Sequence, residues 1–203
     1  MEVAHNFWLL RRLAAGLAVA SAALLAGCGV VPSGPAAPAT PAVVQPKPAP
    51  KPPRVGVALG GGAARGFAHI GVLQVLEEQG IRPDVVVGTS AGSVVGALYA
   101  AGKTPTELAT MAMSLDESSI TDWVFPGRSL LKGEALAKFV RTHTGGKNIE
   151  AMRVPLGIVA TDLQSGQPIL FRRGDVGTAV RASSSVPAVF EPVRISGREY
   201  VDG

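Results

Sequence analysis

The chain has 203 residues, a formal net charge of +4 and one cysteine, Cys28. A single cysteine excludes an intrachain disulfide, and the basic residues form no run with interleaved aromatic side chains, so we expect no nucleic acid partner. Residues 54–203 are long enough for about one domain, and no internal repeat is visible.

Residues 1–27 have the pattern of a signal peptide. Arg11 and Arg12 precede an uncharged run at 13–27 that ends in small residues. This run is shorter than the roughly 20 residues that a membrane span needs. The stretch Leu25-Ala26-Gly27-Cys28 closely resembles the lipobox of bacterial lipoproteins, whose cysteine is lipidated and becomes the mature amino terminus.

The lipobox resemblance implies a lipid anchor at Cys28 and a place in the bacterial cell envelope. Gly29 follows the cysteine and no Asp does, which by family analogy fits sorting to the outer membrane, on its periplasmic or surface side. A lipobox protein carries several acyl chains, which hold a protein durably where one chain would not. The alternative is an ordinary secretory signal with a chance cysteine.

Residues 28–53 are predicted to form a tether between this anchor and the folded part. Nine of the chain's sixteen prolines lie between Pro32 and Pro53, among Ala, Val and a few Lys. Such a composition cannot build a core and favours extended polyproline II, so we expect a semi-rigid spacer. A partner-binding proline motif is the alternative.

The remaining residues, 54–203, predict one α/β domain. The expected elements, in chain order, are a strand at 54–59, a helix at 67–80, a strand at 85–87, helices at 94–100, 104–113 and 133–142, strands at 154–161 and 168–172, a helix at 175–184 and a hairpin at 193–201. Trp123 and Phe125 are expected to pack in the less regular segment at 116–128, between the helices at 104–113 and 133–142. Alternating strands and helices with fully apolar strands indicate a three-layer α/β sandwich around a central, mostly parallel sheet.

A Gly-x-Ser-x-Gly motif at Gly88-Thr89-Ser90-Ala91-Gly92 lies between the apolar strand and the helix that follows it. A strand, a sharp turn and a helix form the context that a nucleophilic serine needs. The two glycines let strand and helix approach closely around Ser90. The alternative is an ordinary turn in which Ser90 caps the helix.

A second glycine-rich loop, at 60–66, follows the first strand. It lacks the pattern Gly-x-x-x-x-Gly-Lys-Ser/Thr, because no Lys-Ser or Lys-Thr closes the loop. It also lacks Gly-x-Gly-x-x-Gly, because Arg65 stands where the last glycine would be, so nucleotide binding is a poor interpretation. If the two strands are neighbours, the N–H groups of Gly61 and Gly62 could face the serine and stabilise an oxyanion. Arg65 could hold the loop or the phosphate of a lipid headgroup.

A nucleophilic serine needs a base, which is usually histidine. His69 lies early on a predicted helix, where a packed or capping imidazole is the simpler interpretation, and His143 follows a helix beside two glycines. A triad in α/β-hydrolase order could combine the elbow serine with Asp116 or Asp122 and with His143. Asp162 follows a strand and could also point at the site, or it could satisfy its own turn.

Three motifs in order resemble the patatin-like phospholipase family, in its bacterial members: Gly60–Gly66, Gly88–Gly92 and Asp202-Gly203. The stretches at 66–73 and 183–190 resemble it as well. The resemblance implies a Ser–Asp dyad, with Ser90 as nucleophile and Asp202 as general base. It also implies an oxyanion hole at Gly60, Gly61 and Gly62, and no metal or other cofactor.

The sequence departs from the family at its end. Family members continue beyond the residue that matches Gly203, so we expect residues 54–203 to be a truncated domain that lacks a carboxyl-terminal part. In that case Asp202 would lie on an unsecured chain end and hold its geometry poorly.

The resemblance implies a serine hydrolase that cleaves fatty-acyl esters, of the phospholipase A, lysophospholipase or esterase type, through an acyl-serine intermediate. Its substrate would be a phospholipid or another acyl ester, and Cys28 would hold the enzyme at a membrane. Two alternatives stay open: an acyltransferase that uses the same acyl-serine, and a non-catalytic surface lipoprotein that binds lipid.

Overall fold

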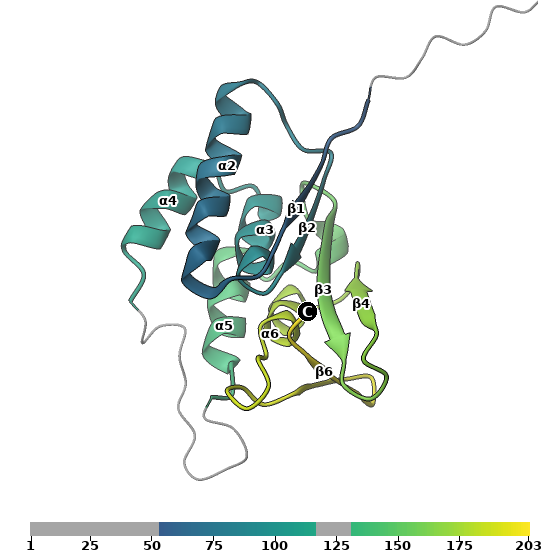
Figure 1. Cartoon of the computed structure of the whole chain (residues 1–203). Coiled ribbons are helices and arrows are strands. Elements are labelled where there is room, and N and C mark those ends of the chain that lie inside the picture. Colours follow the sequence, from purple (N-terminus) through teal and green to yellow (C-terminus); the bar gives the residue numbers. More distant parts are fainter. Residues whose placement is uncertain (1–52, 117–130) are drawn as a thin grey trace, which may run out of the picture. The chain divides into compact units, whose positions relative to one another are not determined.

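The computed structural model describes residues 53–116 and 131–203 (Figure 1). The predictions for the signal peptide, Cys28 and the tether lie outside these residues, and so do those for Asp122, Trp123 and Phe125. The described residues belong to one compact unit, Lys51–Gly203.

The elements follow the predicted order. They are β1 (Gly56–Leu59), η1 (Ala63–Gly66), α2 (Phe67–Glu78), β2 (Val85–Thr89), α3 (Ala91–Ala101), α4 (Pro105–Met113), α5 (Glu134–His143), η3 (Ile149–Ala151), β3 (Leu156–Asp162), β4 (Pro168–Phe171), α6 (Val176–Ser183), β5 (Val193–Ile195) and β6 (Arg198–Val201). The 60–66 loop, predicted without regular structure, closes with the short 3-10 helix η1. Helix α3 begins three residues earlier than predicted, because its first turn starts directly after Ser90.

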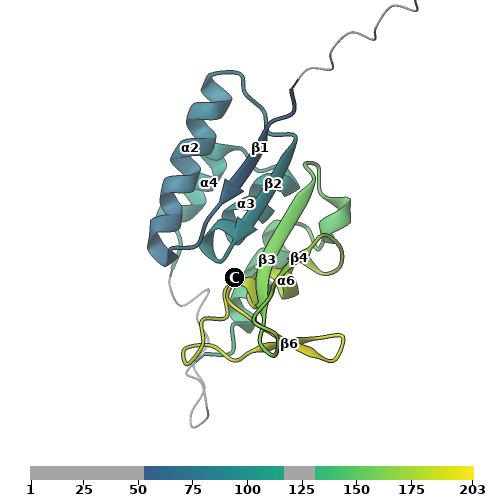
Figure 2. The same cartoon turned by 45° about the vertical axis from the view of Figure 1, so that its right-hand side comes forward.

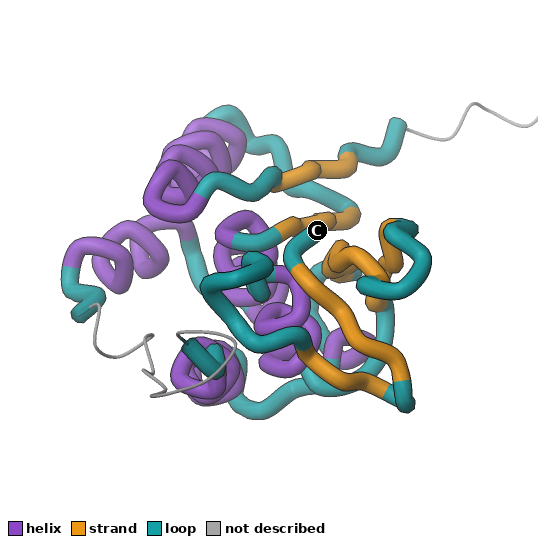
Figure 3. The backbone as a smooth tube through the Cα atoms, turned by 60° about the horizontal axis from the view of Figure 1, so that its bottom comes forward, coloured by secondary structure: helices purple, strands orange, loops and turns teal. Residues whose placement is uncertain are grey.

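The strands form one mixed sheet. β1, β2 and β3 are parallel neighbours, whereas β4 and β6 each pair with β3 in the antiparallel sense, and β5 pairs with β6. The helices gather on one side of the strands (Figure 3), and α3 and α6 contact the sheet. The predicted fold class, an α/β sandwich with a central sheet, is confirmed, and β1, β2 and β3 are its parallel part. In the described residues the helices lie on one side of the sheet (Figure 3), whereas the expected three-layer arrangement has them on both. On β1 the side chains alternate more than predicted, because Ala58 is exposed while Leu59 is buried.

The main core lies between the sheet and its two covering helices. Val86 and Ile158 from the strands, Ala97 from α3 and Val180 from α6 are fully buried there. Burial of a Val or Ile side chain stabilises a fold by about 1.5–3 kcal/mol. This packing fixes α3 and α6 against the strands whose ends carry the site.

Side-chain caps define two helix ends. Thr104 and Glu107 form a capping box at α4, as Thr104-Pro105-Thr106-Glu107 predicts. Asp175 caps α6 and pairs with Arg141 of α5, with an Nη2–Oδ1 distance of 2.8 Å. Burial alone would raise the pKa of Asp175, but the hydrogen bonds from Arg141 and Thr178 lower it to about 2. The ionised carboxylate therefore joins α5 to α6 across the neutral pH range.

Strands β2 and β6 lie end to end along one edge of β3. Thr89 pairs with Val159 and Val201 pairs with Thr161, while β4 pairs with the same two β3 residues and so occupies the opposite edge. Because β2 runs parallel to β3 and β6 runs antiparallel, their carboxyl ends point toward each other (Figure 2). The residues that directly follow Thr89 and Val201 therefore lie close together.

Candidate active site

Ser90 occupies a strained turn between β2 and α3. Its backbone has φ 50° and ψ −125°, a combination that costs a non-glycine residue of order 1–3 kcal/mol. Two glycines make the turn possible: a Cβ on Gly92 would lie 2.1 Å from the Leu59 carbonyl oxygen, and one on Gly88 would lie 2.4 Å from the Gly92 oxygen. The strand and the helix thus approach as closely as the motif predicts.

The side chain of Ser90 meets the residue that follows β6. Its Oγ donates a hydrogen bond to Oδ2 of Asp202, with a distance of 2.9 Å, across 112 residues of sequence. The pair is partly buried. A carboxylate on a serine hydroxyl is the arrangement in which the carboxylate could take the serine proton.

The environment of Asp202 favours its protonated form. Burial raises the pKa of this carboxyl above its ordinary value, while hydrogen bonds from the Ser90 hydroxyl and the Gly203 backbone lower it less. A raised pKa makes a carboxylate a stronger base when it is ionised.

The end of helix α6 holds both sides of this pair. Ser183 Oγ accepts the backbone N–H of Ser90 at 2.8 Å and donates its own hydrogen to the Val159 carbonyl of β3. The Ser185 carbonyl accepts the N–H of Asp202 at 3.0 Å. Ser183 and Ser185 are fully buried. We call residues 183–185 the serine clamp.

The clamp corrects one expectation. The sequence suggested that Asp202 would lie on an unsecured end, yet its backbone is held by Ser185, and the N–H of Gly203 points to the Ser183 carbonyl at 3.4 Å. These contacts join residues 17 and 20 positions apart, which is why the sequence alone did not indicate them.

The glycine loop lies against the serine. A Cβ on Gly61 would stand 3.3 Å from the Ser90 Cβ and 3.9 Å from its Oγ, whereas one on Gly60 would meet nothing within 4 Å. The Gly62 carbonyl accepts hydrogen bonds from the Arg65 backbone N–H at 3.0 Å and from the Arg65 Nε at 3.5 Å. Arg65 therefore contacts the glycine loop, which is one of the two roles that the sequence suggested for it.

Sequence reasoning gave His69 no definite partner, and the structure provides one. Its Nε2 lies 2.8 Å from the Gly60 carbonyl oxygen, and because a carbonyl can only accept, this nitrogen is the donor. A histidine two residues into a helix after a glycine-rich loop was the available signal, but the partner carbonyl could not be identified from spacing.

The other candidate residues lie elsewhere. Within the described residues the Ser90 hydroxyl hydrogen bonds a carboxylate and no histidine. The His143 ring packs on Phe139, with ring centroids 4.4 Å apart. Asp162 accepts hydrogen bonds from Arg198 and Ser165, which lower its pKa to about 2. Asp162 therefore satisfies its own turn and the neighbouring hairpin.

Over residues 53–116 and 131–203, His, Cys, Asp and Glu side chains form no group of three that could hold a metal ion. In the same part of the chain, no helix combines the length and apolar character that crossing a membrane requires.

The motifs that meet here are also those that a family model recognises. The model of the patatin-like phospholipase family matches residues 57–203. The chain belongs to this family. An uncharacterised NTE family protein of Mycobacterium tuberculosis (strain ATCC 25618 / H37Rv) is 42% identical over 154 residues, which cover 74% of this chain and 42% of that protein. Patatin-like phospholipase domain-containing protein 6 of Mus musculus is 34% identical over 145 residues, which cover 68% of this chain and 11% of that protein.

Solved structures show the same patatin-like fold. VipD from Legionella pneumophila matches with a TM-score of 0.64 at 15% identity, over 75% of this chain and 46% of that chain. The type III effector protein ExoU, from Pseudomonas aeruginosa, matches with a TM-score of 0.52 at 20% identity, over 68% of this chain and 40% of that chain. The chain thus spans less than half the length of these proteins.

The raised pKa of Asp202 predicts a pH-dependent stability change on its substitution. Because the folded state binds this proton more tightly than the unfolded state, wild-type stability falls as pH rises from the unfolded pKa through the folded one. Asp202→Asn carries no charge, so we expect a larger free energy of unfolding than wild type at pH 7, with the gain shrinking below about pH 4. Urea unfolding at both pH values measures it.

Asp162→Asn is the matched control, because the pKa of Asp162 is lowered to about 2. This substitution should reduce stability at pH 7, and the loss should shrink as the pH falls toward 2. If both substitutions destabilise the protein at pH 7 to a similar degree, the account of the Asp202 environment is wrong.

Proposed function

We propose that this patatin-like protein is a serine hydrolase of lipid acyl esters. The observation that carries the proposal is the 2.9 Å hydrogen bond from Ser90 Oγ to Asp202, formed on a strained turn at the start of a helix. Membership of a phospholipase family, shown by the match at residues 57–203, supports an acyl ester as substrate.

In the first half of the proposed reaction, Asp202 takes the Ser90 hydroxyl proton while Oγ attacks the ester carbonyl carbon. The carbonyl oxygen becomes an oxyanion, then the bond to the alcohol breaks and the departing alcohol takes the proton from Asp202. The product is an acyl-serine. In the second half, Asp202 takes a proton from water and the resulting hydroxide attacks the acyl carbon. The bond from that carbon to Ser90 Oγ then breaks, Oγ takes the proton from Asp202, and the fatty acid leaves.

The oxyanion needs hydrogen-bond donors that are not already used. The N–H of Ser90 is bonded to Ser183 Oγ and so is occupied. We therefore assign the oxyanion to N–H groups of the 60–62 loop, of which Gly61 lies nearest the serine. The hydrogen bonds from His69 and Arg65 to the carbonyl groups of Gly60 and Gly62 hold that loop. The amino-terminal end of α3 adds a favourable dipole.

The sequence before the domain suggests where the enzyme acts. We propose that residues 1–27 are a lipoprotein signal, that Cys28 is lipidated, and that residues 28–53 tether the domain at 54–203 to a membrane of the bacterial cell envelope. This proposal rests on the lipobox resemblance and the proline content. An anchor of this kind would keep the site close to phospholipid.

Replacement of the nucleophile tests the proposal directly. The full-length protein should hydrolyse a p-nitrophenyl acyl ester and should be labelled at Ser90 by a fluorophosphonate. Ser90→Ala should lose both, with kcat reduced by at least about 10³-fold. A thermal melt confirms that the variant is folded. Turnover retained by folded Ser90→Ala would remove this serine from the mechanism.

Ser183 is expected to act as a positioning residue, because it holds the Ser90 backbone without reaching the substrate. Loss of one buried hydrogen bond costs about 1–1.5 kcal/mol, so Ser183→Ala should lower kcat about tenfold while KM changes much less. The comparison is Ser185→Ala, which removes an equally buried hydroxyl that bonds the Arg181 carbonyl instead. It should reduce kcat by less. Equal losses of kcat would mean that Ser183 matters only for stability.

A further inference from the structure

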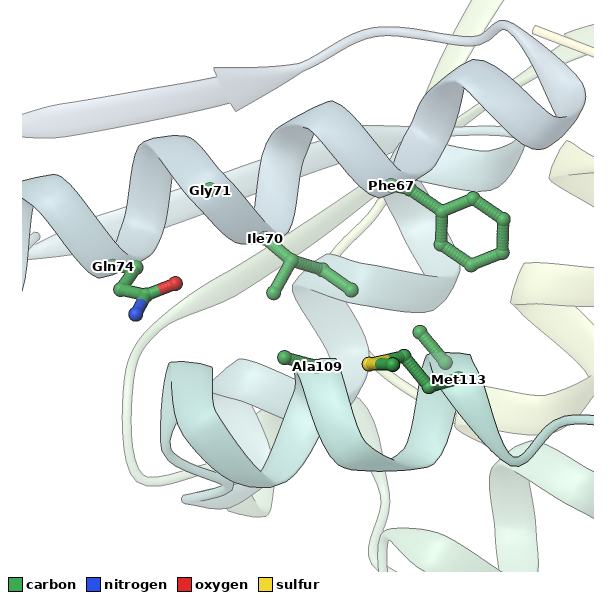
Figure 4. A pocket seen from close by; sticks show the side chains of 7 residues that line it. Phe67, Ile70, Gly71, Gln74, Ala109 and Met113 are labelled. Atoms are coloured by element: carbon green, nitrogen blue, oxygen red, sulfur yellow. The ribbon is translucent and has the colours of Figure 1, made fainter.

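An apolar hollow of about 360 Å³ lies between helices α2 and α4 (Figure 4). Its lining includes Phe67, Ile70, Gly71 and Gln74 from α2, and Ala109 and Met113 from α4. The α2 residues are spaced three and four apart, so they share one face of the helix. The volume is within the range of small-molecule sites, and Gln74 is its one side chain with a polar amide.

The hollow exists because the residues that face each other across it are small. A Cβ at Gly71 would meet no atom within 4 Å, and α4 presents Ala109 and Ala112 to the same space. At one end the space is flanked by large apolar side chains that are still accessible: Phe67 is 53% exposed and Met113 is 91% exposed. Exposed apolar groups of this size are available to an apolar ligand.

Phe67, at one end of the hollow, lies close to the candidate active site through its chain neighbour Gly66. Phe67 directly follows Gly66, whose Cα packs so closely on Ala91 that a Cβ there would lie 2.7 Å from the Ala91 Cβ. Ala91 is the neighbour of Ser90 in the chain. From Phe67 the lining of the hollow follows α2 to Gln74, about 10 Å at 1.5 Å per residue (Figure 4).

We propose that the hollow between α2 and α4 binds the acyl chain of the ester that Ser90 attacks. This inference rests on the proposed function. An acyl chain has the chemistry that the lining accepts, because it is apolar and needs no hydrogen-bond partner. It enters past Phe67 with its carbonyl at Ser90 and lies between Gly71 and Ala109. The length of the hollow then favours medium-length chains over short ones.

Gly71→Leu tests the proposal, because it fills the hollow without meeting another atom at its Cβ and replaces glycine by a better helix former. We compare kcat/KM of the full-length protein for p-nitrophenyl octanoate and acetate, both kept as monomers in solution. In wild type, kcat/KM for the octanoate should be at least about tenfold higher than for the acetate, because the longer chain buries more methylene groups. In Gly71→Leu this ratio should fall at least about tenfold.

Val72→Leu is the matched control, since it enlarges a side chain that is 51% exposed on the same helix and does not line the hollow. It should keep the wild-type ratio.

If wild type hydrolyses both esters and Gly71→Leu leaves the ratio unchanged, the acyl-chain proposal is overturned while the proposed function stands. If wild type hydrolyses neither ester, the proposed function itself fails. A loss of sedimentation with phosphatidylglycerol vesicles at an unchanged ratio would make the hollow a membrane contact, which also overturns the proposal.

Discussion

The structure depends on the meeting of two strands along one edge of β3. β2 approaches from one direction and β6 from the other, and β4 fills the opposite edge, so the residues after Thr89 and Val201 converge. The 2.9 Å contact between Ser90 and Asp202 follows from this register. A shift of either strand by two residues would preserve which side chains face the core and would still separate the hydroxyl from the carboxylate.

This meeting has an energetic cost that the surrounding packing offsets. Ser90 adopts a backbone conformation that non-glycine residues avoid, and burial disfavours the charged form of Asp202. Both are held by the serine clamp, which is anchored by the Val159 carbonyl and by the packing of α6 on the sheet. Strain and a perturbed pKa at one place are typical of a functional site. The acyl-chain hollow, if occupied, would extend this site along α2.

Much of this arrangement could be predicted from the sequence, because the signals were local. The Gly-x-Ser-x-Gly turn, the glycine loop and the capping box at α4 each depend on residues a few positions apart. Family resemblance then paired Ser90 with Asp202. What could not be predicted was non-local: the bond between Ser183 and the Ser90 backbone spans 93 residues, and no periodicity encodes such a contact. The exposed face of β1 was also missed, since a short apolar run is compatible with burial on one side or both.

The most direct test of the central claim is a crystal structure of the full-length protein after reaction with an alkyl fluorophosphonate. We expect phosphorus bonded to Ser90 Oγ, Asp202 still beside that oxygen, and the phosphoryl oxygen about 2.7–3.1 Å from N–H groups of the 60–62 loop. An adduct on another residue, an unmodified Ser90, or a phosphoryl oxygen directed away from the glycine loop would contradict it.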